Sequence, residues 1–283
     1  MIDLHTHSTA SDGSCSPTEL VELAHRARLS AVALTDHDTM GGLAEAKAAG
    51  ARLGIEVIPG CELSVGEGKR SMHIVGLWLP EHPGALQARL DFVLEARASR
   101  NAKIVAKLRD LGIDITLAEI EAEAQGTVGR PHFAKVLVRK GAANSIQDAF
   151  DRLVGNDGKA YVPRVRLTPE EGIRLLSGEG AMPVLAHPYL YALSDADLDE
   201  TVARFKSYGL EAIEAYYTEH SQAQTAFYKA LAERHGLLVS GGSDFHGDPK
   251  PWCKIGIGRG SLRVPDAVLD AMKAHRRSRG QWV

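Results

Sequence analysis

Two histidines and an aspartate near the start of the chain have the types and spacing of metal ligands. His5 and His7 follow the apolar run 1–4 with one residue between them, and Asp12 comes shortly afterwards. Alternate residues of a strand point the same way, so both imidazoles can face one metal ion. A chain with 12 histidines in 283 residues contains about 0.5 such pairs by chance, so the pair alone does not identify a metal site.

Two more sets of ionisable residues stand where apolar runs end or begin. The motif 36–38 (Asp-His-Asp) follows the run 31–34, and three ionisable groups there are costly unless they are solvated or bound to a cation. Glu62 ends a predicted strand and His73 opens the next, with turn residues at 66–69. A hairpin of these strands would bring Glu62 and His73 to the same end of the sheet.

The second half of the chain repeats this arrangement. His187 closes one apolar run, and Asp244 and His246 follow another, after Gly241 and Gly242, which would let the backbone approach a ligand closely. Imidazole and carboxylate groups without thiolate suit Mn²⁺, Fe²⁺ or Zn²⁺ rather than a structural zinc finger. Nine such ligands are enough for two or three ions, which is typical of a hydrolytic site.

Short apolar runs separated by amphipathic stretches must position these residues. Capping boxes at Ser16–Glu19, Thr116–Glu119 and Thr168–Glu171 predict where helices begin. Alternation of strands and helices predicts a mainly parallel α/β sheet or barrel, with its site at the carboxyl ends of the strands. The runs that we interpret as buried strands are 1–4, 31–34, 56–58, 74–79, 183–186, 212–215, 237–240 and 255–257.

One region interrupts the alternation. Residues from about 99 to 164 carry helical patterns and little strand signal. We therefore predict a barrel formed by 1–98 and 165–283, with a helical insertion at 99–164. The length of 283 residues then corresponds to one barrel with an insertion rather than to two separate domains.

The composition is typical of a soluble globular protein, with 44% hydrophobic residues, 24% charged residues and a net charge of −3. The chain contains no run of about 18 apolar residues and no secretory signal, so we expect no membrane association. Cys15, Cys61 and Cys253 form no CxxC pair, which favours a reducing, cytoplasmic environment. No protein partner is evident, and the near-neutral charge argues against a dedicated nucleic-acid surface.

Five motifs contain the ionisable residues: HTHSxxSDG, TDHDT, PGCE followed by MHIVG, AHP and GSDFH, in that order over essentially the whole chain. They resemble the motifs of the PHP (polymerase and histidinol phosphatase) superfamily. The resemblance implies an α/β fold, a distorted barrel of seven β/α units, that encloses a trinuclear metal centre. It implies three divalent metal ions, for which Mn²⁺ is our first expectation and Fe²⁺ and Zn²⁺ are alternatives.

The resemblance also assigns the ligands and suggests a mechanism. Glu62, Asp244, His37 and His187 are our candidates for catalysis. We hypothesise that a hydroxide held between the ions attacks phosphorus in line, and the general acid stays open between His37, His187 and His220. The implied ligand sets are His5, His7, Glu62 and Asp244 for one ion; Glu62, His73 and His187 for a second, with Glu62 bridging; and Asp12, His37 and His246 for the third.

The predicted insertion distinguishes branches of the superfamily. The motif 129–134 (GRPHFA), followed by 161–163 (YVP), resembles stand-alone bacterial phosphoesterases that act on nucleotides. Arg130 opens a predicted helix and could present a guanidinium fork to a phosphate, with His132 and Lys135 within the next turn. We predict that these three residues bind substrate and that the insertion caps it. The alternative, that Arg130 and Lys135 only solvate the insertion, stays open.

The resemblance to this branch implies a metal-dependent phosphomonoesterase that removes the 3′-phosphate of adenosine 3′,5′-bisphosphate and also acts on short 5′-phosphorylated oligoribonucleotides. One alternative is histidinol-phosphate phosphatase, although that enzyme favours a compact barrel without the insertion. An alternative of another class is a non-catalytic module that binds metal or nucleic acid. Such a module should have lost ligands, and this sequence retains all nine.

Overall fold

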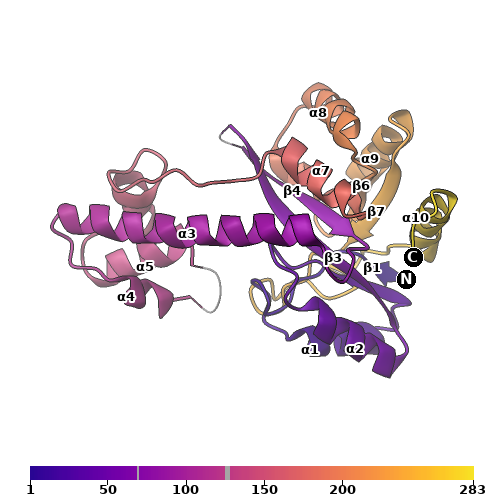
Figure 1. The fold of residues 1–283 in the computed structure, drawn as a ribbon, viewed down its shortest axis with the longest axis horizontal. Helices are drawn as coiled ribbons and strands as arrows, with labels where there is room; N and C mark the ends of the chain where they lie inside the picture. Colours follow the sequence, from indigo (N-terminus) through magenta and orange to yellow (C-terminus); the bar gives the residue numbers. More distant parts are fainter. Residues whose placement is uncertain (69, 125–127) are drawn as a thin grey trace. The chain divides into compact units, whose positions relative to one another are not determined.

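The chain folds into two compact units. The computed structural model describes residues 1–68, 70–124 and 128–283. Unit 1 comprises residues Met1–Gln87 and Leu167–Val283, and unit 2 comprises Ala88–Arg166. Figure 1 shows the helices and strands of both units. Among the described residues, no helix has the length and apolar character that crossing a membrane requires.

Unit 1 is an α/β barrel whose seven strands are neighbours in chain order (Figure 1). β4 is antiparallel to β3 and β5, and the other pairs are parallel. The barrel is nearly closed, because the Leu4 N–H donates to the Gly241 carbonyl at 3.1 Å between the first and last strands. The predicted fold is confirmed. The strands are β1 (Ile2–Asp3), β2 (Ala31–Leu34), β3 (Glu56–Glu67), β4 (Arg70–Leu77), β5 (Met182–Leu185), β6 (Ala212–Tyr217) and β7 (Leu238–Gly242).

Two helices of unit 1 begin at predicted capping boxes. Ser16 Oγ accepts a hydrogen bond from the Glu19 N–H at 3.2 Å, and Glu19 Oε2 accepts one from the Ser16 N–H at 2.8 Å. Thr168 and Glu171 make the same pair of bonds. The helices are α1 (Pro17–Arg26), α2 (Leu43–Leu53), α7 (Pro169–Gly178), α8 (Asp195–Tyr208), α9 (Gln222–Arg234) and α10 (Asp266–Ser278), with the 3₁₀ helix η2 (Pro188–Tyr191).

Apolar side chains of the short strands form the core of unit 1. All residues of β2 and β5 are buried. One apolar cluster joins strands on both sides of the barrel through Trp78, Met182 and Val264. A second cluster packs α1 and α2 against β2 (Figure 1). Removing these side chains from water is the main favourable contribution to folding. Because this core stabilises the barrel, the residues that follow the strands can be polar.

Unit 2 has its own apolar core. Phe133, Val136 and Leu137 lie fully buried on one side of α5 and pack against Ile104 and Leu108. All regular elements in the described part of this unit are helical. They are α3 (Gly84–Asp110), whose first residues belong to unit 1, α4 (Leu117–Glu121), α5 (Arg130–Arg139), α6 (Ile146–Ala149) and the π-helix η1 (Phe150–Val154).

The apolar run 255–257 does not form the predicted strand. Gly256 and Gly258 have φ angles of 75° and 53°, values that glycine adopts readily and other residues do not. They turn the chain back so that Lys254 and Gly258 pair with each other. The Gly256 N–H donates to Asp3 Oδ2 at 2.7 Å. The prediction is wrong because the two glycines outweigh the β-propensity of the flanking isoleucines.

Candidate metal centre

Glu62 lies fully buried near the middle of β3. The prediction that Glu62 ends a strand and that His73 opens the next is wrong, because the hairpin pairing continues past both residues to Glu67 and Arg70. β3 and β4 form the predicted antiparallel hairpin, although the predicted turn at 66–69 includes Lys69, which lies outside the described residues. The Glu62 N–H donates to the Asp36 carbonyl at 3.1 Å, and the Asp38 N–H donates to the Glu62 carbonyl at 3.0 Å. These bonds hold the end of β2, with the motif 36–38, beside Glu62.

The carboxylate of Glu62 faces different histidines with its two oxygens. Oε1 lies 2.9 Å from both His73 Nδ1 and His187 Nε2. Because each oxygen has its own set of nitrogens, this carboxylate has the geometry to bridge two cations. The nitrogens near Oε2 are His37 Nδ1 at 3.0 Å, His5 Nε2 at 3.3 Å and His7 Nε2 at 3.3 Å.

Asp244 supplies the second buried carboxylate. Its Oδ1 lies 3.2 Å from His7 Nε2 and 3.5 Å from His246 Nδ1. Its Oδ2 accepts hydrogen bonds from the Tyr217 hydroxyl at 3.0 Å and from Lys250 Nζ at 2.6 Å. These two donors orient the carboxylate so that Oδ1 stays directed at the imidazoles.

Gly242 is required where β7 approaches β1. A Cβ atom added to Gly242 would lie 2.4 Å from His5 Cβ and 2.5 Å from the backbone nitrogen of His5. A larger residue would therefore displace the strand that carries His5. We expected the two glycines at the end of β7 to admit a ligand; Gly242 instead admits the backbone of the neighbouring strand.

Asp12, His37 and His246 form a third set with greater exposure to solvent. Asp12 Oδ1 lies 3.4 Å from His246 Nε2, and Asp12 Oδ2 lies 3.8 Å from His37 Nε2. The Asp12 side chain is 55% exposed, whereas that of His7 is fully buried. The set therefore lies at the solvent side of the cluster.

Asp36 supports the loop that carries Asp12. Its Oδ1 accepts hydrogen bonds from the Ser8 N–H at 2.7 Å and the Ser11 hydroxyl at 2.6 Å. Its Oδ2 accepts one from the Ser8 hydroxyl at 2.7 Å. These donors satisfy a carboxylate that is costly to bury without partners. The sequence indicated a solvated or cation-bound group here, and hydrogen bonds from the loop take that role.

The structure brings all nine predicted ligands together. They form four groups, and within each group the ligand atoms all lie within 4.8 Å of one another. Several residues belong to two groups. His73 and His187, predicted in one set, belong to different groups, although His73 Nδ1 lies only 3.3 Å from His187 Nε2. The groups are His7, Asp12, His37 and His246; His5, His7 and Asp244; His5, Glu62 and His187; and His37, Glu62 and His73.

The donor atoms of this cluster fit divalent cations. Imidazole nitrogen and carboxylate oxygen are the ligands that transition-metal ions of this class bind. Several of these atoms are buried and make no hydrogen bond among the described residues, which is costly unless a cation satisfies them. They are His5 Nε2, both ring nitrogens of His7, His37 Nδ1, His187 Nδ1 and Glu62 Oε2.

The buried charges of the cluster shift one another's proton affinity. Burial alone would lower the pKa of His5, but the carboxylates of Glu214 and Glu62 raise it well above its ordinary value. For His7, burial is likewise outweighed by the negative charges of the nearby Asp244 and Glu62 carboxylates, which raise its pKa to about 9. Despite burial, the surrounding imidazoles hold the pKa values of Glu62 and Asp244 well below their ordinary range. In the metal-free protein, protons thus stabilise the carboxylates that a cation would otherwise neutralise.

Three supporting residues were missed by sequence reasoning, namely Glu214, Tyr217 and Lys250. Glu214 is a charged residue within the apolar run 212–215, and this is itself a signal, because a carboxylate in a buried strand requires buried partners. Lys250 lies in a loop after the GSDFH motif and has no comparable signal. His220, one candidate for the general acid, donates from Nδ1 to the Ala215 carbonyl at 2.9 Å and belongs to none of the four groups.

The predicted substrate-binding residues lie on α5 of unit 2. Arg130 Nη1 donates to Asn156 Oδ1 at 2.8 Å, and its guanidinium lies 6.0 Å from the Tyr161 ring centre. His132 Nδ1 accepts a hydrogen bond from the Gly129 N–H at 3.0 Å, which caps the start of the helix. Lys135 is exposed on the same helix.

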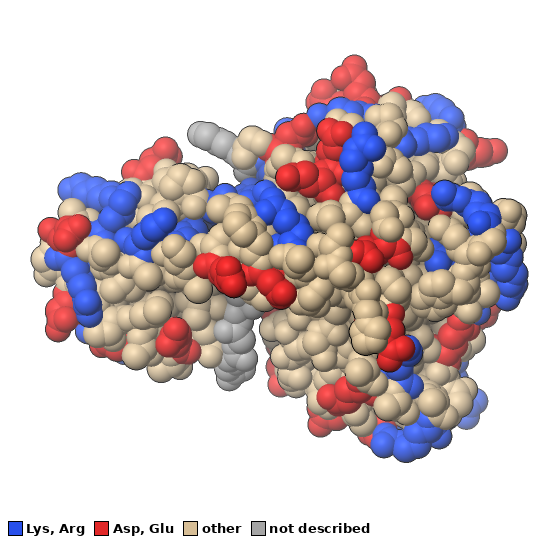
Figure 2. Space-filling model, viewed as in Figure 1, with Lys and Arg blue, Asp and Glu red and all other residues tan. Residues whose placement is uncertain are grey.

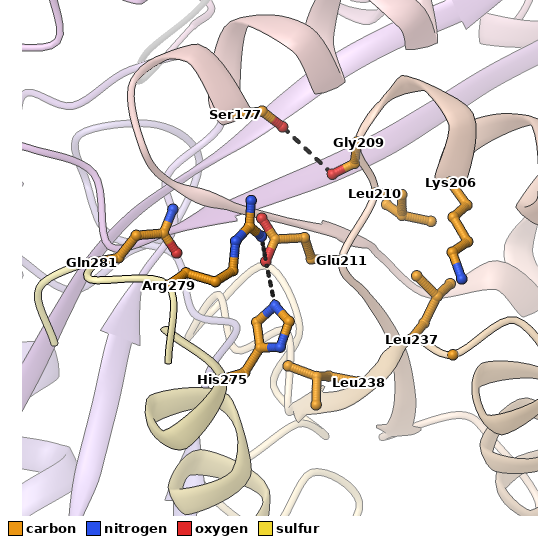
Figure 3. Close-up of a pocket in the computed structure, with 11 residues that line it drawn as sticks. Ser177, Lys206, Gly209, Leu210, Glu211, Leu237, Leu238, His275, Arg279 and Gln281 are labelled. Carbon is orange, nitrogen blue, oxygen red and sulfur yellow. Dashed lines mark hydrogen bonds and ion pairs between the residues drawn. The ribbon is translucent and has the colours of Figure 1, made fainter. Parts of the chain in front are cut away.

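Unit 1 also contains a pocket of about 390 Å³ at the other end of its strands (Figure 3). Glu211, which directly precedes β6, lies in this pocket, whereas the metal-ligand groups lie near the carboxyl ends of the strands. Figure 3 shows Glu211 between His275 Nε2 at 3.1 Å and Arg279 Nη1 at 2.9 Å. The only carboxylate lining the pocket is therefore already paired, and the pocket is separate from the candidate metal centre.

Comparison with known proteins identifies the family. Residues 3–97 match the model of the PHP domain. A 3′,5′-nucleoside bisphosphate phosphatase from Chromobacterium violaceum is 36% identical over 247 residues, which is 87% of each chain. The chain belongs to the PHP family. The 5′-3′ exoribonuclease Rnm of Escherichia coli, a further relative of this PHP protein, is 36% identical over 261 residues, or 90% of this chain and 87% of the relative.

A solved structure extends the similarity to the fold of the PHP protein. The structure of a Bifidobacterium adolescentis protein, assigned as a metal-dependent phosphoesterase, has a TM-score of 0.74 at 30% identity. The match covers 96% of this chain and 95% of the other. The resemblance seen in the five motifs is thereby confirmed, and the groups of His, Asp and Glu side chains are consistent with more than one metal site.

Proposed function

We propose that this PHP-family phosphoesterase uses divalent cations to remove the 3′-phosphate of adenosine 3′,5′-bisphosphate. The observation that carries the proposal is the surroundings of Glu62, where five imidazole nitrogens lie within 3.3 Å of one buried carboxylate. The similarity to a bisphosphate phosphatase over 87% of the chain supports the choice of substrate.

The nine ligands hold the cations in this proposal, with Mn²⁺ as the expected ion. Bound divalent cations would lower the pKa of a water molecule and neutralise charge on the phosphate oxygens. Glu62 would share its oxygens between two cations, while Tyr217 and Lys250 keep one oxygen of Asp244 directed inward. His37 and His187 complete the proposed catalytic set, since each has a ring nitrogen within 3.0 Å of Glu62.

Unit 2 supplies the site for the second phosphate in this proposal. The described hydrogen bonds of Arg130 all use Nη1, and a guanidinium has five N–H donors, so Nε and Nη2 can bind a phosphate in bidentate fashion. His132 accepts through Nδ1, so its Nε2 carries the proton and can donate to an anion. Lys135 adds a positive charge on the same helix.

A second candidate function is the trimming of short 5′-phosphorylated oligoribonucleotides. It is favoured by the similarity to the Escherichia coli exoribonuclease over 90% of the chain. Figure 2 shows acidic and basic side chains intermixed on the visible face rather than one basic field. Because binding along a nucleic acid backbone depends on many basic contacts, this surface favours short substrates.

A substrate panel tests the proposal. The protein is incubated with Mn²⁺ and either adenosine 3′,5′-bisphosphate, a 5′-phosphorylated diribonucleotide or histidinol phosphate, and phosphate release and the nucleotide products are measured. We expect the highest kcat/KM for the bisphosphate, with adenosine 5′-phosphate as the product. Preference for the diribonucleotide would support the second candidate, and preference for histidinol phosphate would refute both.

A further inference from the structure

Glu214 lies in a strand that carries no metal-ligand motif, and it contacts two predicted metal ligands. It lies in β6 and is only 2% exposed. Its Oε1 lies 2.9 Å from His5 Nδ1, and its Oε2 accepts a hydrogen bond from the His187 backbone N–H at 2.7 Å. One buried carboxylate therefore contacts residues of the segments that follow β1 and β5.

The contact with His5 determines which ring nitrogen is available to a cation. An ionised carboxylate only accepts hydrogen bonds, so His5 Nδ1 carries a proton and donates it to Glu214. This leaves His5 Nε2, which lies 3.3 Å from Glu62 Oε2 and 3.7 Å from Asp244 Oδ1, as the ring nitrogen available to a cation. A hydrogen bond from the outer ring nitrogen to a carboxylate commonly orients metal-binding histidines in this way.

The contact with His187 fixes the backbone of a second ligand. His187 has a φ angle of 26°, in the left-handed region that non-glycine residues rarely adopt. The bond from its N–H to Glu214 holds this backbone while His187 Nε2 lies 2.9 Å from Glu62 Oε1. Glu214 thus orients ligands on both sides of Glu62, since His5 faces Oε2 and His187 faces Oε1.

We propose that Glu214 is a positioning residue that sets the affinity of this centre for divalent cations. The inference rests on the metal centre of the proposed function, but not on the identity of the substrate. A Gln at this position keeps the shape but has one acceptor oxygen where the native residue has two. The His187 backbone N–H can only donate a hydrogen bond, so the amide oxygen of the Gln would accept from it. The amide NH₂ would then face His5 Nδ1. His5 would then favour the form with its proton on Nε2, where the cation binds.

Glu211→Gln is a matched control for Glu214→Gln. Both glutamates belong to the same segment around β6, and both contact a histidine ring nitrogen at about hydrogen-bonding distance, 3.1 Å for Glu211 and His275. Glu211 lies in the pocket of Figure 3, away from the metal centre. The two variants therefore separate the loss of a histidine-paired carboxylate in general from the loss of the one that orients His5.

The experiment measures Zn²⁺ and Mn²⁺ affinity of the full chain by competition with a chromophoric chelator. We expect Glu214→Gln to weaken affinity for at least one bound ion by about 10- to 100-fold, and Glu211→Gln to leave it unchanged. Unchanged affinity in Glu214→Gln, or an equal loss in both variants, would overturn the positioning role. No substrate is used, so a wrong substrate assignment does not affect this result.

An NMR measurement on the unmodified protein provides a second readout that does not depend on a variant. In the Zn²⁺-loaded chain, ¹⁵N-labelled on histidine, we expect His5 to carry its proton on Nδ1 with a downfield, slowly exchanging resonance. The same resonance should persist in Glu211→Gln and shift or broaden in Glu214→Gln. An unprotonated His5 Nδ1 in the wild-type protein would overturn the proposal even if the variant fails to fold.

Discussion

Raising the pH should destabilise the metal-free protein, because the carboxylates of the cluster hold a proton on His7. The pKa of His7 is raised from 6.5 to about 9. A group with a raised pKa in the folded state binds its proton more tightly there than in the unfolded chain. Its contribution to stability is therefore fully present below pH 6.5 and is lost as the pH rises through about 9. The raised pKa of His5 acts in the same direction.

The magnitude follows from the size of the shift. One pKa unit corresponds to about 1.36 kcal/mol, so His7, which is fully buried, contributes about 3 kcal/mol to the free energy of unfolding. Between pH 6.5 and 9 this free energy should fall by about 1.4 kcal/mol per pH unit. For a chain of this size the melting temperature should fall by roughly 6–12 °C over the interval.

The assay is thermal unfolding followed by circular dichroism, in excess EDTA, at half-unit steps from pH 6 to 9.5. The control is His7→Gln, which removes the titrating group and keeps a polar side chain of similar reach. The variant should lose the part of the decline that His7 contributes and keep the part that His5 contributes. Addition of Zn²⁺ should stabilise the wild-type protein more at pH 8.5 than at pH 6.5, because metal binding displaces the protons.

Two results would refute this reasoning. The first is a melting temperature of the metal-free wild-type protein that stays constant or rises between pH 6.5 and 9. The second is a decline of equal steepness in His7→Gln, which would assign the decline to groups other than His7. In either case the buried carboxylates would not hold a proton on His7.

Three further predictions concern single residues. Glu62→Ala should abolish turnover and lower the bound metal measured by elemental analysis, because its carboxylate faces two sets of imidazoles; unchanged metal content would contradict the bridging role. Arg130→Ala should raise KM for adenosine 3′,5′-bisphosphate by about 10- to 100-fold, from the loss of a charged hydrogen bond, and affect p-nitrophenyl phosphate much less; equal effects in steady-state kinetics would exclude a site for the second phosphate. Phe133→Ala should destabilise unit 2 by about 3–5 kcal/mol in urea unfolding, because Phe133 is fully buried in its core; a loss below about 1 kcal/mol would contradict that packing.

The sequence by itself predicted the family, the fold class and the nine side chains that the structure brings together. The i, i+2 pairs at strand ends and the hairpin between Glu62 and His73 follow from strand geometry, which is local. Capping boxes such as Ser16–Glu19 depend on residues three positions apart, so their chemistry is also visible in the sequence. The run 255–257 failed as a strand because two glycines changed the backbone conformation, an effect that hydrophobic pattern alone does not predict.

Only the tertiary structure decided how these residues share their contacts. The two oxygens of Glu62 face separate imidazoles because β3 lies between the strand that precedes His37 and the strand that carries His73. Gly242 is required because β7 approaches β1, and these strands are far apart in the sequence. Glu214 is a single charged residue in an apolar run, and its two partners, His5 and His187, come from distant strands. Hydrogen bonds between distant segments depend on the closure of the barrel, which no local pattern specifies.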